Sequence, residues 1–237
     1  MKTKICLPIT ESTEKAVLAE AKAVKEAAPD LVELRADFLE YEENAKEVVD
    51  TLKALKEIVG SMDVIFTYRS KSQGGNGGLA PEKVAALLAV AAASSYVSYV
   101  DVELKFFENA AELIAELKEK GVKVIASHHD FNCTPKKKEL LGILSEMKDA
   151  GASVCKLAVM PKSELDVLKL MKASAEFKEE NPKQPVITMS MGKLGAISRM
   201  GCSVSGSEVT FASREKASAP GQREITKLRD ILEVVEG

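Results

Sequence analysis

The segment Val154-Cys155-Lys156-Leu157-Ala158-Val159-Met160, residues 154–160, has the length and composition of a buried β-strand, except that it contains one lysine. An ammonium group is rarely removed from water, because its desolvation is costly unless the group is paired or loses its proton. A lysine amine without that proton is a nucleophile that can attack a ketone and form a Schiff base. The strand therefore carries a candidate catalytic residue, Lys156.

Helical patterns flank this strand, and the same alternation extends in both directions along the chain. Short apolar runs predict eight strands, at Lys4–Ile9, Leu31–Asp37, Val64–Arg69, Val97–Leu104, Val122–His129, Val154–Met160, Pro185–Met191 and Glu208–Ala212. Amphipathic stretches predict the helices, at Glu14–Ala28, Asn44–Val59, Pro81–Ser94, Glu108–Lys120, Pro135–Ala150, Ser163–Glu180 and Glu224–Val235. Pro81 and Pro135 suit the first turn of a helix, and Gly121 and Gly151 suit its end.

This alternation predicts a parallel sheet covered by helices, and the number of strands favours a closed TIM (β/α)8 barrel over an open doubly wound sheet. The pattern is weakest at Gly192–Ser207, where the glycines leave room for only a short helix. Since no linker, low-complexity tract or charge run divides the chain, we expect residues 1–237 to form a single catalytic barrel domain.

The composition excludes several classes of protein. A formal net charge of −3 disfavours nucleic acid and anionic membranes as partners, and no apolar run approaches the roughly 18 residues of a membrane span. The segment Met1–Lys4 leads into an apolar run too short for a signal sequence. The four cysteines are widely spaced without a CxxC pair, which is typical of reduced thiols in a cytoplasmic protein.

Charged residues in the second predicted strand indicate where a site lies. Alternate side chains share one face of a strand, so Glu33, Arg35 and Asp37 lie together on the face opposite the apolar residues. Because helices cover the outside of a parallel barrel, this charged face is expected to point into the barrel mouth. The alternative is that the strand ends at Leu34 and the charged residues form a solvated loop.

The other strands carry distinctive side chains toward their C-terminal ends, where barrel enzymes place their chemistry. These residues are Arg69, Asp101, Glu103, His128, His129, Met189 and Met191. One convergent site is the prediction. The two adjacent histidines point in opposite directions on a strand, and the pattern does not say which one faces the interior. Their spacing does not suit zinc, so no metal is expected.

The state of Lys156 depends on its neighbours in that mouth. Burial and nearby arginines disfavour the protonated amine. The arginines concerned are Arg35, Arg69 and Arg199. The alternative is a structural ion pair between Lys156 and Glu33 or Asp101.

Two loops at this end of the barrel are expected to cover the site. Ser70–Gly78 is rich in glycine but lacks a Walker A pattern, which favours a flexible lid over a phosphate cradle. Ser213–Gln222 follows the eighth strand, and its residues Ser218 and Gln222 precede the last helix, a favourable place for a carboxylate.

Segments spread over nearly the whole chain resemble the type I 3-dehydroquinate dehydratase family, the Schiff-base-forming lyases of the shikimate pathway. The segments are Glu33-Leu34-Arg35-Ala36-Asp37, Phe66-Thr67-Tyr68-Arg69-Ser70, His129-Asp130-Phe131, Lys156-Leu157-Ala158-Val159-Met160-Pro161, Met191-Gly192-Lys193-Leu194-Gly195, Ser198-Arg199 and Ser218-Ala219-Pro220-Gly221-Gln222. Their occurrence in this order along a chain of barrel length makes the resemblance specific.

The resemblance implies a TIM barrel, usually a homodimer, that dehydrates 3-dehydroquinate to 3-dehydroshikimate without a metal or cofactor. It implies that Lys156 forms the imine and that His129, rather than His128, is the general acid and base. The implied substrate-binding residues are Glu33, Arg35 and Arg69 around the hydroxyls, Arg199, Ser218 and Gln222 at the carboxylate, and Met191 and Phe211 as apolar walls. Whether the enzyme serves aromatic biosynthesis or quinate catabolism stays open.

The chain departs from the family pattern at Gln73, where the family usually has glutamate. Loss of that charge is expected to lower the pKa of His129 relative to its relatives and to alter, without abolishing, activity. The N-terminal hairpin of some relatives is also expected to be absent. Two alternatives stay open: a class I aldolase-type barrel, and a metabolite-binding barrel that has lost turnover.

Overall fold

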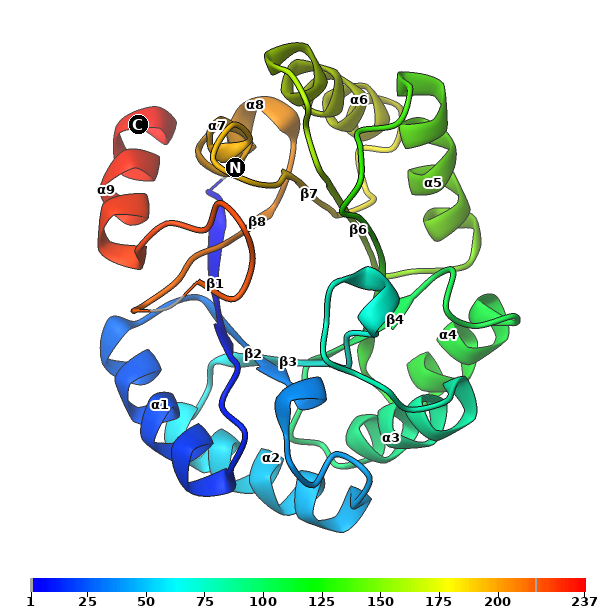
Figure 1. Ribbon diagram of the computed structural model, residues 1–237, viewed down its shortest axis with the longest axis vertical. Helices are drawn as coiled ribbons and strands as arrows, with labels where there is room; N and C mark the ends of the chain where they lie inside the picture. Colours follow the sequence, from blue (N-terminus) through cyan, green and yellow to red (C-terminus); the bar gives the residue numbers. More distant parts are fainter. Residues whose placement is uncertain (1, 216) are drawn as a thin grey trace.

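The computed structural model describes residues 2–215 and 217–237; Met1 and Lys216, which belong to the N-terminal segment and the last loop considered above, lie outside the described residues. The strands are β1 (Lys4–Ile9), β2 (Leu31–Arg35), β3 (Asp63–Thr67), β4 (Tyr99–Glu103), β5 (Lys123–Asp130), β6 (Val154–Val159), β7 (Val186–Ser190) and β8 (Val209–Phe211). They pair in parallel in the order β7-β6-β5-β4-β3-β2-β1-β8. Figure 1 shows the helices in a ring around them.

The two ends of this strand order, β7 and β8, close the barrel through a short seam. The Glu208 amide donates a hydrogen bond to the Val186 carbonyl at 2.8 Å, and the Thr188 amide donates to Ser207 Oγ at 3.0 Å. The sheet is therefore a nearly closed, eight-stranded parallel barrel with interleaved helices. The prediction of a TIM (β/α)8 barrel is confirmed.

The helices lie where the apolar periodicity predicts them. They are α1 (Glu14–Ala27), α2 (Ala45–Val59), α3 (Pro81–Ala93), α4 (Ala110–Glu119), α5 (Lys137–Asp149), α6 (Glu164–Glu180), α7 (Ala196–Met200), α8 (Cys202–Ser205) and α9 (Ile225–Glu236), with 3₁₀ turns η1 (Ala36–Phe38) and η2 (Lys71–Gln73). The predicted ends are displaced by no more than two residues. Pro81 is the first residue of α3 as expected, but Pro135 precedes α5, so its predicted place in the helix is wrong.

The glycine-rich region after β7 forms two short helices, α7 and α8, in place of a long one. A Cβ atom at Gly195 would lie 2.2 Å from the carbonyl oxygen of Ser190, so only glycine allows this close approach of the chain to the end of β7. The turn directs α7 back over the C-terminal end of the barrel. That arrangement brings Arg199 toward the site.

Apolar side chains fill two regions on either side of the sheet. Val32 and Leu34 belong to the larger region between strands and helices, whereas Leu31 belongs to a smaller one inside the barrel. The alternation of faces along β2 therefore has the orientation that the sequence predicts. In the part of the chain that the structure describes, no helix has both the length and the apolar character needed to cross a membrane.

Candidate active site

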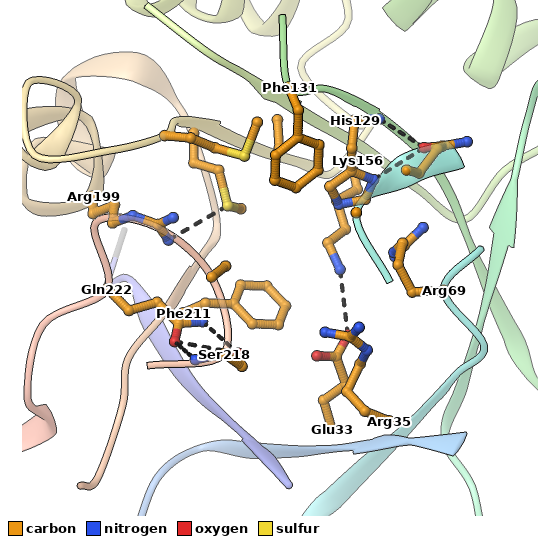
Figure 2. Close-up of a pocket in the computed structure, with 16 residues that line it drawn as sticks. Glu33, Arg35, Arg69, His129, Phe131, Lys156, Arg199, Phe211, Ser218 and Gln222 are labelled. Carbon is orange, nitrogen blue, oxygen red and sulfur yellow. Dashed lines mark hydrogen bonds and ion pairs between the residues drawn. The ribbon is translucent and has the colours of Figure 1, made fainter. Parts of the chain in front are cut away.

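An open pocket of about 520 Å³ lies at the C-terminal ends of the strands. The ten residues predicted as catalytic or substrate-binding all line it: Glu33, Arg35, Arg69, His129, Lys156, Met191, Arg199, Phe211, Ser218 and Gln222. Three others expected at this end of the barrel do not line it, namely Asp101, Glu103 and His128. Figure 2 labels nine of the ten lining residues, all except Met191, and shows their side chains around a shared space, with Lys156 and Glu33 on one side and Arg199 on the other. The prediction of one convergent site agrees with this arrangement.

Lys156 lies inside the barrel with only 4% of its surface exposed. Its Nζ is 3.4 Å from Glu33 Oε1 and 3.3 Å from Asp101 Oδ2, and it lies 4.5 Å from the centroid of the Phe211 ring. The alternative interpretation, an ion pair of Lys156 with Glu33 or Asp101, therefore describes contacts that the structure contains. Neither carboxylate contacts the lysine alone. Thr67 donates to the same Glu33 oxygen at 2.8 Å, and Arg69 contacts Asp101.

Arg69 links the carboxylates on the adjacent strands. Its guanidinium contacts Asp101 Oδ2 and Glu103 Oε1, each at 2.9 Å, and donates to Ser127 Oγ at 2.9 Å. Burial alone would lower the pKa of Arg69, but the two carboxylates outweigh it and raise that pKa. Burial likewise raises the pKa of Asp101, and the positive charges of Arg69 and Lys156 more than reverse this, so the pKa is lowered. This side of the pocket is a closed network of opposite charges.

The histidine that lines the pocket is His129, whereas His128 does not line it. His129 pairs across the sheet with Ala158, which shares the inward face of β6 with Lys156. The backbone amide of His129 donates to Gln73 Oε1 at 2.7 Å, which identifies that atom as the oxygen. The same oxygen lies 3.1 Å from His129 Nδ1, so Nδ1 carries the proton and Nε2 is left as the basic nitrogen.

The pKa of His129 is well below its usual value of 6.5. Burial is the main cause, and the positive charges of Arg69, Lys156 and Arg35 add to it. The imidazole is therefore neutral at physiological pH. A neutral histidine with one basic nitrogen is suited to accept a proton.

The loop that follows β3 delivers Gln73 to this histidine. The Gly77 amide donates to the carbonyl of Arg69 at 3.0 Å, and the Gly75 amide donates to the carbonyl of Ser70 at 2.9 Å. These bonds fold Ser70–Gly78 back on itself and place the side chain of Gln73 in a buried position. Whether the loop opens as a lid stays a prediction.

Asp37 differs from the prediction. The strand β2 ends at Arg35, and Asp37 lies in the 3₁₀ turn that follows, where it is buried but does not line the pocket. Its carboxylate accepts two hydrogen bonds from the Arg35 guanidinium, both at 2.8 Å, and one from the Asn76 amide at 3.0 Å. Asp37 therefore holds Arg35 and the Gln73 loop in place from behind the site. Since Glu33 and Arg35 are buried and line the pocket, the solvated-loop alternative is wrong.

The opposite wall of the pocket carries Arg199, which is 1% exposed and contacts no carboxylate among the described residues. Its guanidinium contacts only weak or neutral acceptors, Met189 Sδ at 3.5 Å and the Pro220 carbonyl at 3.2 Å, and its Nε has no partner. Burial lowers its pKa to about 10. A buried cation without a counter-ion is a strong candidate to bind an anionic group.

Ser218 and Gln222 lie beside Arg199 on the loop after β8. The Gln222 side-chain oxygen accepts a hydrogen bond from the Ser218 amide at 2.8 Å, and its nitrogen donates to Ser218 Oγ at 2.9 Å. These contacts join the uncharged side chains of Ser218 and Gln222 to each other across the loop. The loop thus supplies hydrogen-bond donors next to the unpaired guanidinium.

The sequence argument did not include every residue around the pocket. Met189 was expected at this end of the barrel, whereas the residues not predicted to line the site are Gln73, Gly74, Phe131, Ala158 and Ala219. Ala158 follows from strand alternation, because it lies two residues after Lys156 in β6. Within the described residues, no three His, Cys, Asp or Glu side chains are grouped as a metal site.

Fold and site together define an α/β-barrel enzyme with a buried lysine, a neutral histidine and a buried arginine without a carboxylate partner around one pocket. A family model described as Type I 3-dehydroquinase matches residues 5–237. This chain belongs to the type I 3-dehydroquinase family.

Individual relatives agree with this assignment over the full length. The 3-dehydroquinate dehydratase of Clostridium novyi is 40% identical over 233 residues, which cover 98% of this chain and 92% of that one. The crystal structure of the Geobacillus kaustophilus 3-dehydroquinate dehydratase superposes with a TM-score of 0.96 at 37% identity, covering 100% of this chain and 92% of that one. The type I enzyme from Clostridium difficile, in a structure with covalently modified comenic acid, gives a TM-score of 0.94 at 38% identity, with coverage of 99% and 92%.

Proposed function

We propose that this enzyme, a type I 3-dehydroquinate dehydratase of the shikimate pathway, acts through an imine on Lys156 with His129 as general acid and base. Residues 1–237 would form one catalytic domain in the cytoplasm. The single observation that carries the mechanism is the burial of a lysine amine in a pocket that also holds a neutral histidine and an unpaired arginine.

The first step joins enzyme and substrate. Lys156 transfers its proton to the carboxylate of Glu33, whose Oε1 lies 3.4 Å from Nζ. The free amine attacks the C3 ketone of 3-dehydroquinate to give a carbinolamine, and the protonated Glu33 returns the proton to the carbinolamine hydroxyl, which leaves as water. The product is a C3 iminium, whose positive charge withdraws electrons from the C2–H bond.

The second step eliminates water. Nε2 of His129 removes the C2 proton, and the electron pair of that bond forms an enamine between C2 and C3. The enamine electrons then re-form the iminium with a C1–C2 double bond, while the C1–O bond breaks and His129 gives its proton to the departing hydroxyl. Water hydrolyses the iminium, which releases 3-dehydroshikimate and restores the Lys156 amine. Gln73 supports this step by accepting a hydrogen bond from the Nδ1–H group, which keeps Nε2 available as the base.

The unpaired guanidinium of Arg199, with Ser218 and Gln222, binds the substrate carboxylate in this proposal. Arg35, Arg69 and Glu33 contact the hydroxyl groups on the other side. Met191 and Phe211 form the apolar walls between the two sides. An aldolase-type barrel would need a phosphate site, whereas a single planar guanidinium with neutral donors suits a carboxylate.

Product absorbance tests this function. Mixing the enzyme with 3-dehydroquinate should produce the ultraviolet absorbance of the conjugated enone in 3-dehydroshikimate. A class I aldolase would cleave a carbon–carbon bond and yield no enone, and an inert binding barrel would yield no product at all. Either result would contradict the proposal.

We also propose that the enzyme acts as a homodimer, as the family resemblance implies. Exposed apolar side chains support this proposal, among them Leu168 on α6 and Ile197 on α7, which are 59% and 54% exposed. Light scattering should give the mass of two chains for the wild type and of one chain for Leu168→Glu combined with Ile197→Glu. The control Val234→Glu, at an 84% exposed position on α9, should remain dimeric. A wild-type monomer would contradict the proposal.

A further inference from the structure

A second, larger cavity opens at the opposite end of the barrel, where the strands begin. Its volume is about 1050 Å³, compared with about 520 Å³ for the catalytic pocket. Its floor consists of inward-facing apolar side chains from six strands, namely Leu31, Ile65, Ile125, Val154, Ile187 and Val209. Each of these is at most 8% exposed, so the floor is recessed inside the barrel rather than spread over its surface.

The rim of this cavity is positively charged. Lys2 and Lys4 line it beside β1, and Lys123 lines it at the start of β5. None of the three forms an ion pair with any residue in the ranges 2–215 and 217–237. The carboxylate of Glu208 also lines the cavity but is already paired with Lys178 at 2.7 Å.

The three lysines approach the cavity from opposite sides. In the strand order, β1 and β5 are four strands apart, which in an eight-stranded barrel places them across the axis from each other. Lys123 Nζ already lies 5.3 Å from the centroid of the Tyr99 ring, so it is directed over an aromatic face at the cavity wall. The cavity therefore combines a recessed apolar floor with ammonium groups that can close over an occupant from two sides.

We propose that this cavity is a second ligand site, for a small organic anion with an apolar and preferably aromatic body, such as an aromatic carboxylate. The part of this space that a water-sized sphere can enter is about 420 Å³, which is in the range of small-molecule sites, and such sites are mostly apolar with a few polar groups that orient the ligand. An aromatic ring would bury its area against the floor, and the carboxylate would bind the lysines at the rim. The catalytic pocket has the reverse character, with ionic groups on its inner wall, so the two sites favour different ligands.

Benzoate is the probe that tests this site, with benzamide as its neutral counterpart. Isothermal titration of the wild-type enzyme with each should give tighter binding of benzoate. The double variant Lys4→Gln and Lys123→Gln should weaken benzoate binding about five- to tenfold. The matched control, Lys22→Gln with Lys53→Gln, removes the same charge from exposed positions on α1 and α2 and should leave the affinity unchanged.

Two further variants separate the sites. Arg199→Met removes the anion-binding group of the catalytic pocket and should leave benzoate binding intact, whereas Val209→Phe fills the second cavity and should weaken it. Thermal unfolding of Val209→Phe verifies that the barrel is folded. Loss of binding in Arg199→Met but not in the lysine variant would overturn the proposal, because benzoate would then occupy the catalytic pocket. Equal loss in both lysine double variants, or no binding at millimolar benzoate, would also overturn it.

Discussion

Arg69 and Arg199 are both buried at the mouth of the same barrel, yet their surroundings are opposite. Arg69 contacts two carboxylates at 2.9 Å, and these raise its pKa. Arg199 contacts a thioether and a carbonyl, and burial lowers its pKa to about 10. One guanidinium has its counter-ions within the protein, and the other lacks them.

The difference separates two tasks that the residue type alone does not reveal. Arg69 contacts Asp101, and Asp101 in turn contacts Lys156, so in the proposed mechanism the charged wall holds the reacting amine in place. Arg199 leaves its charge available for the substrate, whose carboxylate would replace the water lost on burial. In the proposed mechanism, one wall of the pocket therefore carries the chemistry and the other binds the substrate.

The largest expected effect comes from the nucleophile on the charged wall. Lys156→Met and Lys156→Arg should each lower kcat by at least about a thousandfold, because neither side chain forms an imine at neutral pH. Arginine keeps the positive charge beside Glu33 and Asp101. A loss of activity in Lys156→Arg would therefore show that the nucleophilic amine, and not only its charge, is required. Steady-state kinetics with circular dichroism of each variant makes the measurement. Substantial activity in Lys156→Arg would show that only the charge is needed.

The difference between the two arginines can be tested by replacing each one and measuring the stability of the protein. Arg69→Met leaves Asp101 and Glu103 buried without their partner, and should lower the free energy of unfolding by about 3–5 kcal/mol. Arg199→Met removes a charge that has no partner and should leave the stability unchanged or raise it. Urea denaturation of both variants against the wild type makes the measurement. A large loss of stability in Arg199→Met would mean that an internal partner was holding that guanidinium.

Replacement of Arg199 should change the kinetic constants rather than the stability. Arg199→Met should lower kcat/KM by an amount that corresponds to about 2–5 kcal/mol of lost transition-state stabilisation. Most of this loss should appear as a higher KM, since the substrate carboxylate loses its charged partner. Arg199→Lys should recover part of this loss, because it restores charge without the planar pair of donors. An unchanged KM in Arg199→Met would place the carboxylate elsewhere in the pocket.

The smallest effect concerns the pH profile. Because the pKa of His129 is well below 6.5, the base stays neutral as pH falls through 6.5, and kcat/KM should decline only at lower pH, where His129 becomes protonated. Gln73→Glu places a negative charge beside Nδ1, favours the protonated ring, and should shift this acidic decline to higher pH by about one unit. Gln73→Asn keeps a neutral amide as the control. A Gln73→Glu profile that coincides with the wild type would exclude any electrostatic role for this position.

Most of the fold could be predicted from the sequence, because the periodicity of apolar residues is a local property. The strand containing Lys156 and its flanking helices are examples, and their ends differ by at most two residues from those predicted. Face alternation also predicted that Glu33 and Arg35 point inward. Asp37 was placed wrongly because the chain turns after Arg35. The alternation of side chains along a strand does not show where such a turn begins, so it does not predict the direction of the Asp37 side chain.

The contacts between distant segments could not be predicted in the same way. Gln73 reaches His129 only because the preceding loop folds back through its own backbone hydrogen bonds. The contact of Lys156 with Asp101 depends on which strands become neighbours across the barrel interior. Local patterns identified these residues, but the distances that decide their charge states arise from the closed sheet.

The account depends on covalent bond formation at Lys156, and reductive trapping tests it most directly. The enzyme is mixed with 3-dehydroquinate, reduced with sodium borohydride, digested and mapped by mass spectrometry. The account predicts loss of activity together with a single reduced adduct on Lys156, and none on Lys156→Arg treated in parallel. An active enzyme that yields no adduct, or an adduct on another lysine, would contradict it.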